Sequence, residues 1–167
     1  MSKKMLVVYY SWTNGNTEKI AKQVARACGA DVERIDTVVP YPDDYDATVS
    51  QGQDEVNAGY KPAIKALAHD VSDYDIVVVG TPTWWYTMAP AVSTFFEQVD
   101  WSGKTLVPFM TNGGWPGHAI EDMKAAARGA SFGPAFEARF DSTGGPRQET
   151  PQTDVDAWIE SVGALLA

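Results

Sequence analysis

The chain has 167 residues, of which 44% are hydrophobic and 21% are charged, and its formal net charge at pH 7 is −9. This length and composition predict one globular domain over residues 1–167. The acidic balance leaves no basic patch that could follow a phosphate backbone, which argues against nucleic acid as a partner. No apolar run approaches the ~18 residues of a membrane span and no signal peptide is visible, so we expect no membrane span and a cytoplasmic protein.

Cysteine and histidine are scarce in this sequence. Cys28 is the single cysteine, and His69 and His118 are the two histidines. One cysteine excludes an intramolecular disulfide and most thiolate metal sites, and two histidines argue against a histidine-rich metal site. We therefore expect no metal. His118 opens a predicted helix, where a solvent-exposed side chain is the simpler interpretation, although a position near a ligand stays open.

Strands alternate with helices along the chain. Apolar, β-rich runs predict strands at 5–10, 31–36, 75–80, 104–110 and 135–140. Amphipathic patterns predict helices at 17–28, about 44–58, 89–99, 117–129 and 153–167. This alternation predicts an α/β fold in which helices cover both faces of a parallel sheet. Ligands of such folds bind beyond the carboxyl ends of the strands, so the loops after strands one, three and four should form any site.

The first of these loops lies in "YYSWTNGNTEKIA", residues 9–21. It offers hydroxyls, amides and one glycine ahead of a helix, from Ser11, Thr13, Asn14, Gly15, Asn16 and Thr17. A helix N-terminus favours an anion, and the absence of lysine or arginine suits a phosphate monoester held by neutral donors. The alternative is that these residues only cap the helix.

The loops after strands three and four carry aromatic residues and glycines. "TPTWWYTMAP" places Trp84, Trp85 and Tyr86 where a flat ligand could stack on them, although we expect at least one of the three to be mainly structural. "TNGGWPGH" offers backbone N–H groups at Gly113 and Gly114, and Trp115 as a further aromatic face. A phosphate at one end and a planar heterocycle at the other describe FMN.

These motifs resemble those of the flavodoxin family. The resemblance is to a flavodoxin-like branch with "TPTWWYT" after strand three and "FMTNGG" after strand four, and it includes "VPYPDDYD" and "DWSGKTLVPF". It implies a three-layer α/β/α sandwich, a five-stranded parallel sheet in the order 2-1-3-4-5, non-covalent FMN and electron transfer. The resemblance assigns phosphate contact to the first loop and flavin contact to the other two.

The predicted cofactor-binding residues form three groups, one from each loop. They are Ser11, Trp12, Thr13, Asn14, Gly15, Asn16 and Thr17; Pro82, Thr83, Trp84, Trp85 and Tyr86; and Thr111, Asn112, Gly113, Gly114 and Trp115. Counted back from Thr17, Trp12 falls where many flavodoxins place a hydroxyl, whereas alignment on Ser11 makes the loop one residue longer. The hydroxyls that contact phosphate therefore stay open.

Three functions are compatible with these residues. The leading hypothesis is an FMN-dependent electron-transfer protein that works with a redox partner protein or a small electron acceptor, and the acidic residues Asp43, Asp44 and Asp46 could dock a basic reductase. An alternative is an FMN-dependent NAD(P)H:quinone-type oxidoreductase. A non-redox interaction domain on the same fold is the third. No glycine lies between Thr81 and Thr87, so a peptide flip to positive φ at a bulky residue there would cost about 1 kcal/mol or more. This cost argues against strong stabilisation of a flavin semiquinone and leaves room for a two-electron reductase.

Overall fold

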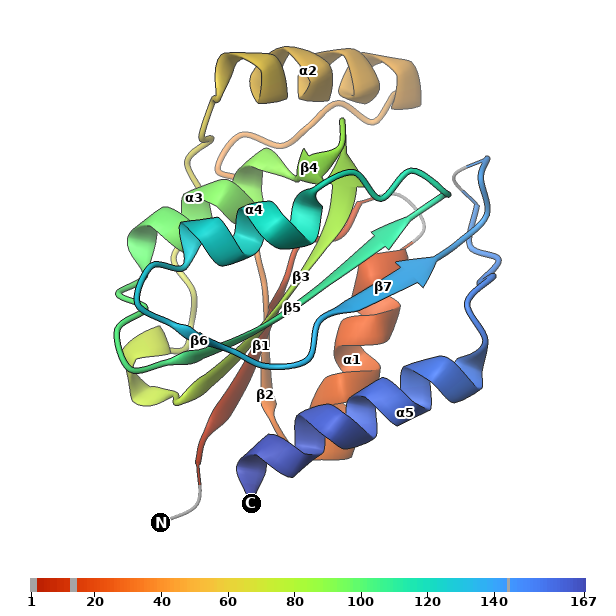
Figure 1. The fold of residues 1–167 in the computed structure, drawn as a ribbon. Coiled ribbons are helices and arrows are strands. Elements are labelled where there is room, and N and C mark those ends of the chain that lie inside the picture. The colour runs from red at the N-terminus through yellow and green to blue at the C-terminus, as the bar shows by residue number, and fades with distance from the viewer. Residues whose placement is uncertain (1–2, 13–14, 144) are drawn as a thin grey trace.

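The computed structural model describes residues 3–12, 15–143 and 145–167, which form a sheet covered by helices on both faces (Figure 1). The sheet has the order β2-β1-β3-β5-β6, with β7 also paired to β5 and β4 paired to β3. Its strands are β1 (Met5–Tyr9), β2 (Asp31–Arg34), β3 (Ile76–Trp84), β4 (Thr87–Met88), β5 (Thr105–Asn112), β6 (Ser131–Phe132) and β7 (Phe136–Arg139). The predicted fold class is confirmed.

Two short strands raise the number of strands above the predicted five. The five predicted strands correspond to β2-β1-β3-β5-β7, which are parallel to their neighbours and lie in the expected order. The two-residue strand β6 pairs with the first part of β5, and β7 pairs with its second part. The two-residue strand β4 is antiparallel to β3 and forms a hairpin with it.

Successive strand residues point to opposite sides of the sheet, so its buried strands present two apolar faces, and helices cover both. Ile20 of α1 (Asn16–Cys28) and Val155 of α5 (Gln152–Gly163) pack on one face. Phe95 of α3 (Pro90–Gln98) and Met123 of α4 (Ala119–Ala126) pack on the other. Two 3₁₀ turns occupy Val71–Asp73 and Ala164–Leu166. Within the described ranges, no helix combines the length and the apolar character needed to cross a membrane.

The remaining helix, α2 (Tyr45–Ala58), stands apart from these two layers at the carboxyl edge of the strands (Figure 1). The Asp44 side chain accepts a hydrogen bond from the backbone N–H of Ala47 at 2.8 Å and caps the helix. Gly59 ends it with a left-handed conformation, φ 64°. The predicted helix at about 44–58 therefore exists, and it lies where ligands of parallel sheets bind.

Strands β3 and β5 run further than the sequence predicted. The expected ends were residues 80 and 110, whereas β3 continues to Trp84 and β5 continues to Asn112. Pro82 pairs with Thr111 across the two strands, and the hairpin with β4 extends β3 beyond that pair. Pro82 to Trp84, Thr111 and Asn112 therefore lie on strands rather than in loops, which corrects the prediction.

Candidate functional site

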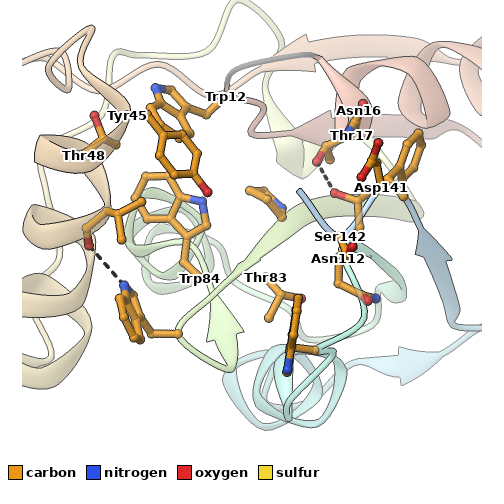
Figure 2. Close-up of a pocket in the computed structure, with 18 residues that line it drawn as sticks. Trp12, Asn16, Thr17, Tyr45, Thr48, Thr83, Trp84, Asn112, Asp141 and Ser142 are labelled. Atoms are coloured by element: carbon orange, nitrogen blue, oxygen red, sulfur yellow. Dashed lines mark hydrogen bonds between the residues drawn. The ribbon is translucent and has the colours of Figure 1, made fainter. Parts of the chain in front are cut away.

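A cleft of about 290 Å³ opens at the carboxyl edge of the sheet, close to the roughly 300–1,000 Å³ of typical small-molecule sites. Figure 2 shows Trp12, Tyr45 and Trp84 on one side and Asn16 and Thr17 on the other. The lining residues come from α1, α2 and the ends of β3, β5 and β7. They are Trp12, Asn16, Thr17, Tyr45, Thr48, Val49, Gly52, Pro82, Thr83, Trp84, Trp85, Thr111, Asn112, Gly113, Trp115, Phe140, Asp141 and Ser142.

The polar wall of the cleft is built on the first turn of α1. The hydroxyl oxygens of Thr17 and Thr111 lie 2.8 Å apart and share a hydrogen bond, and both residues are almost fully buried. The Asn16 amide donates to the carbonyl of Gly145 at 3.2 Å. No lysine or arginine lines the described part of the cleft. Neutral groups at a helix N-terminus therefore form this wall, which suits an anion.

The aromatic wall is a cluster of rings centred on Trp84. Trp12 stacks on Tyr45 of α2, with ring centroids 5.5 Å apart and an interplanar angle of 25°. Trp84 meets the ring of Tyr41 edge-on at 5.2 Å and that of Tyr10 at 5.8 Å. Trp84 thus lines the cleft and also packs against the core. Its role is therefore both structural and lining, whereas we expected at least one of the three aromatic residues to be mainly structural.

Trp85 and Tyr86 form the two-residue turn between β3 and β4. Their φ angles are 49° and 70°, the left-handed conformation that a type I′ turn requires at both positions. Two bulky residues therefore hold positive φ angles here, a conformation that we expected to be costly without glycine. The glycine that permits the turn is Gly117: a Cβ there would lie 2.2 Å from the carbonyl oxygen of Tyr86. This carbonyl accepts from the backbone N–H of His118 at 2.7 Å, which helps hold the turn.

A carboxylate in the first turn of α4 also stabilises the hairpin of β3 and β4. One oxygen of Asp122 accepts from the hydroxyl of Thr87, the residue that follows the turn, at 2.5 Å. The same oxygen lies 2.5 Å from His118 Nδ1. The His118 side chain is exposed and does not line the cleft. The structure therefore places His118 behind the hairpin as a support for it.

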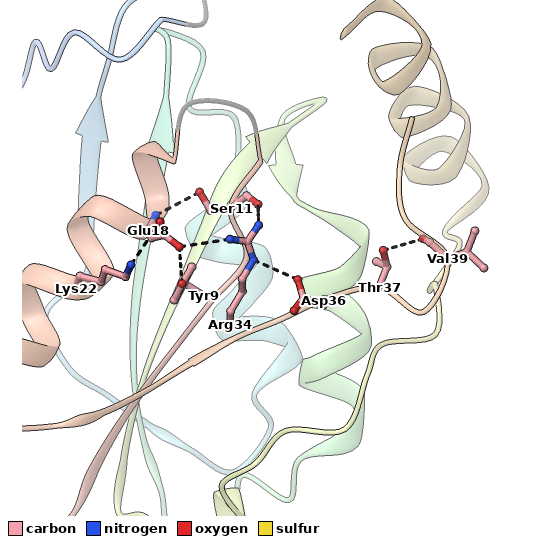
Figure 3. A network of polar contacts seen from close by, with 8 residues as sticks. All are labelled: Tyr9, Ser11, Glu18, Lys22, Arg34, Asp36, Thr37 and Val39. Carbon is pink, nitrogen blue, oxygen red and sulfur yellow. Dashed lines mark hydrogen bonds and ion pairs between the residues drawn. The ribbon is translucent and has the colours of Figure 1, made fainter. Parts of the chain in front are cut away.

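A polar network lies behind the first loop (Figure 3). The backbone N–H of Glu18 donates to Ser11 Oγ at 3.3 Å, and the Arg34 guanidinium donates to the Ser11 carbonyl at 3.2 Å. The Tyr9 hydroxyl donates to the Glu18 carboxylate at 2.7 Å. Burial and this carboxylate raise the pKa of Tyr9 to about 12, and the Tyr9 hydrogen bond lowers the pKa of Glu18. Ser11 is buried in this network, where its hydroxyl helps cap α1.

The structure brings most of the predicted site residues to the cleft. From the prediction, the cleft is lined by Trp12, Asn16, Thr17, Pro82, Thr83, Trp84, Trp85, Thr111, Asn112, Gly113 and Trp115. The lining does not include Ser11, Gly15, Tyr86 and Gly114. Gly114 instead donates its N–H to Asn112 Oδ1 at 2.7 Å, which shapes the loop after β5. Thr13 and Asn14 lie outside the described residues.

Two groups of lining residues were missed from the sequence. Four belong to α2, namely Tyr45, Thr48, Val49 and Gly52. This segment is polar and has no apolar face from which a burial direction could be inferred. Three follow β7, namely Phe140, Asp141 and Ser142. The carboxyl-end rule applies to the fifth predicted strand as well, so it could have indicated these three.

Comparison with known proteins identifies the family of the chain. A family model described as Flavodoxin matches residues 4–140. The chain belongs to the flavodoxin family. Over 100 residues it is 36% identical to an NAD(P)H dehydrogenase (quinone) of Cupriavidus metallidurans, a match that covers 57% of the chain and 46% of that protein. The chain thus spans about half the length of the curated relatives it matches.

Two solved structures share the flavodoxin fold over nearly the whole chain. A putative flavoprotein from Bacteroides eggerthii is 30% identical, with a TM-score of 0.77 and coverage of 97% of this chain and 98% of that chain. A flavoprotein in complex with FMN from Lactobacillus acidophilus is 22% identical, with a TM-score of 0.73 and coverage of 94% and 99%. The second likeness supports the fold alone.

Proposed function

We propose that the chain binds FMN non-covalently in this cleft and takes part in electron transfer. The observation that carries the proposal is the pairing of an aromatic wall with a wall of neutral hydroxyl and amide groups across one cleft at the carboxyl edge of the sheet. Flavodoxins are themselves a standard example of ligand binding at this edge. The position is therefore expected for the family, and the support for FMN comes from the chemistry of the two walls.

The donors on the polar wall fit a phosphate monoester. One hydroxyl of the Thr17–Thr111 pair and the second N–H of the Asn16 amide can donate to phosphate oxygens beside the N-terminus of α1. Asp141 lines the same region and would repel an anion, but one of its oxygens accepts from the Thr143 N–H at 2.9 Å and from the Thr143 hydroxyl at 2.7 Å. Its other oxygen lies 3.8 Å from Arg147 Nε. The Asp141 carboxylate is therefore engaged with Thr143 and Arg147 on both of its oxygens.

The opposite end of the cleft fits a planar heterocycle. Trp84, Trp85 and Trp12 would provide stacking surfaces for the ring and exclude water from it. Asn112 and Gly113 would supply polar groups to its edge. Bound FMN supplies the redox chemistry, while the protein binds, orients and shields it.

An electron carrier and an NAD(P)H:quinone-type oxidoreductase are both compatible with this site. The identity of 36% to an NAD(P)H dehydrogenase (quinone) supports the second function. The acidic residues Asp43, Asp44 and Asp46 beside the cleft support the first, because an exposed acidic rim favours a basic redox partner protein. An interaction domain without FMN is the remaining alternative, and it would leave the aromatic wall without a ligand.

A turnover experiment with the FMN-loaded protein separates these functions. A reductase oxidises NADH or NADPH in proportion to an added small quinone, with no other protein present. A carrier is inert to both nucleotides and accepts electrons only when a flavodoxin reductase is added. Failure of the purified chain to retain FMN would contradict both redox functions and leave the interaction domain.

A further inference from the structure

Helix α2 covers the aromatic side of the cleft but contributes no large apolar side chain to the core. Its buried residues are Thr48, Gly52 and Glu55. By comparison, α3 buries Val92, Phe95 and Phe96. Because the burial of an apolar face provides most of the stability of a helix in a folded protein, α2 lacks the usual attachment.

The contacts that hold α2 in place are made with the lining of the cleft. Tyr45 stacks on Trp12. Gly52 lies against the ring of Trp84, where an added Cβ would be 3.1 Å from Cε3. The indole N–H of Trp85 donates to the carbonyl of Val49 at 3.2 Å. A ligand that occupies the cleft would therefore meet the same side chains that fasten the helix.

A buried carboxyl group lies under the C-terminal half of α2. Glu55 is 9% exposed, and neither its Oε2 nor the hydroxyl oxygen of Tyr41 has a hydrogen-bond partner of ordinary geometry among the described residues. Burial raises the pKa of Tyr41, and a contact with the Glu55 carboxylate, too distorted for an ordinary hydrogen bond, raises it further. Unsatisfied polar atoms destabilise the position in which they are buried. Water would satisfy both atoms if α2 moved outward.

The chain segments before and after α2, at residues 36–38 and 62–65, are joined by backbone hydrogen bonds. The N–H of Val38 donates to the carbonyl of Ala63 at 2.9 Å, and the N–H of Lys65 donates to the carbonyl of Asp36 at 2.8 Å. Thr94 of α3 donates its hydroxyl to the carbonyl of Pro62 at 2.7 Å, which anchors the second segment to the core. Tyr41 also packs on Tyr10 and Trp84, and therefore belongs to the fixed part. The segment from residue 42 to residue 60 can then move as a unit on this fixed part, with Gly59 near its end.

We propose that residues 42–60, which include α2, form a lid over the ring end of the cleft. The closed lid excludes water and bulky molecules from the ring, and the open lid admits FMN and a flat electron acceptor. The buried Glu55 carboxyl lowers the stability of the closed state, so that the lid opens readily. The identity of the occupant rests on the proposed function, whereas the movement of α2 does not.

Hydrogen exchange of the FMN-free protein tests the lid directly. Amides of residues 48–58 should exchange faster than the internal amides of α3, because α2 opens without global unfolding. Glu55→Met removes the unsatisfied carboxyl and should slow exchange in α2 by about fivefold or more. Gln53→Met, on the exposed face of the same helix, is the control for helix propensity and should leave exchange unchanged. Equal protection of α2 and α3, or equal effects of the two variants, would overturn the proposal.

The rate of FMN dissociation provides a second test. Glu55→Met should slow dissociation, and Gly52→Ala should accelerate it, because the added methyl group would press on Trp84 even though alanine favours a helix. If Gly52→Ala and Glu55→Met leave the rate unchanged while FMN binds, the lid does not control access. If FMN does not bind at all, the proposed function fails, and the exchange experiment still decides whether α2 moves.

Discussion

The hydroxyl oxygens of Thr17 and Thr111 lie 2.8 Å apart and join the first turn of α1 to the end of β5. Both residues line the cleft, although 94 positions separate them in the chain. Their contact fixes two hydroxyl groups beside a helix N-terminus before any ligand arrives, and the hydroxyl that accepts within the pair keeps its own hydrogen for a ligand. Such preorganisation favours binding because the donors lose little freedom when they meet the ligand.

Thr17→Val should weaken FMN binding about tenfold, which corresponds to the ~1.4 kcal/mol of one hydrogen bond to a charged group. The substitution keeps the shape of the side chain but removes the hydroxyl. Affinity for riboflavin, which lacks the phosphate, should stay the same. Quenching of flavin fluorescence measures both affinities, and Thr105→Val at the other end of β5 is the control. Equal losses for the two ligands would place the phosphate elsewhere.

Joint replacement of Trp84 and Trp85 by alanine should weaken FMN and riboflavin to a similar extent, because both ligands have the same ring. Trp84→Ala alone should also lower the free energy of unfolding by about 2 kcal/mol, since its ring packs edge-on against Tyr10 and Tyr41. Fluorescence titration and urea unfolding measure the two effects. Unchanged affinity for both ligands would remove these tryptophans from the site.

Gly117→Ala should destabilise the hairpin far more than Gly59→Ala destabilises the end of α2. Both glycines have positive φ angles, 57° and 64°. At Gly59 nothing lies within 4 Å of an added Cβ, so only the backbone strain of about 1 kcal/mol remains. At Gly117 the Cβ would collide with the carbonyl of Tyr86, which should raise the loss to roughly 3 kcal/mol or more. Urea unfolding of the two variants checks the difference, and equal losses would contradict the role of Gly117.

Tyr9 should make stability fall at alkaline pH. Its pKa is raised from 10.0 to about 12 in the folded protein, so the folded state holds this proton more tightly than the unfolded state. The resulting stabilisation is complete below pH ~10 and is lost as the pH rises through ~12. Tyr9→Phe should therefore reduce the loss of stability between about pH 8 and about pH 11. Urea midpoints measure this, with Tyr60→Phe as an exposed control; an unchanged loss in Tyr9→Phe would contradict the assignment.

Tyr9→Phe should also alter the acid side of the profile. The Tyr9 hydrogen bond is the largest cause of the lowered pKa of Glu18. A carboxylate with a lowered pKa stabilises the folded state above its unfolded pKa, and this stabilisation is lost as the pH falls. Without the Tyr9 hydroxyl, the Glu18 carboxylate should contribute less, so stability should decline less steeply below about pH 4.5.

Local chemistry made part of the cleft predictable. Asn16 and Thr17 were identified because several hydroxyl and amide residues gather between a buried strand and a helix N-terminus, where an anion is favoured. Trp84 and Trp85 were identified because two adjacent tryptophans after a buried strand suggest a flat ligand. Both inferences depend on short stretches of sequence. The parallel sheet was predictable for the same reason, since each strand and helix carries its own pattern.

Long-range contacts account for what was missed. The turn at Trp85 and Tyr86 has positive φ angles because Gly117, more than thirty positions later, leaves room for the carbonyl of Tyr86. Tyr45 and Gly52 reach the cleft because α2 rests on Trp12 and Trp84, a placement that no periodicity in the helix indicates. Such features depend on tertiary contacts that sequence patterns do not show.

Parallel titration of the FMN-free protein with FMN and with riboflavin tests the central claim most directly. If the aromatic wall stacks the ring and the first turn of α1 holds the phosphate, FMN should bind tightly and riboflavin much more weakly. Binding of either ligand should quench its flavin fluorescence. Equal affinities would contradict the phosphate site on α1, and no binding of either ligand would contradict the proposed function as a whole.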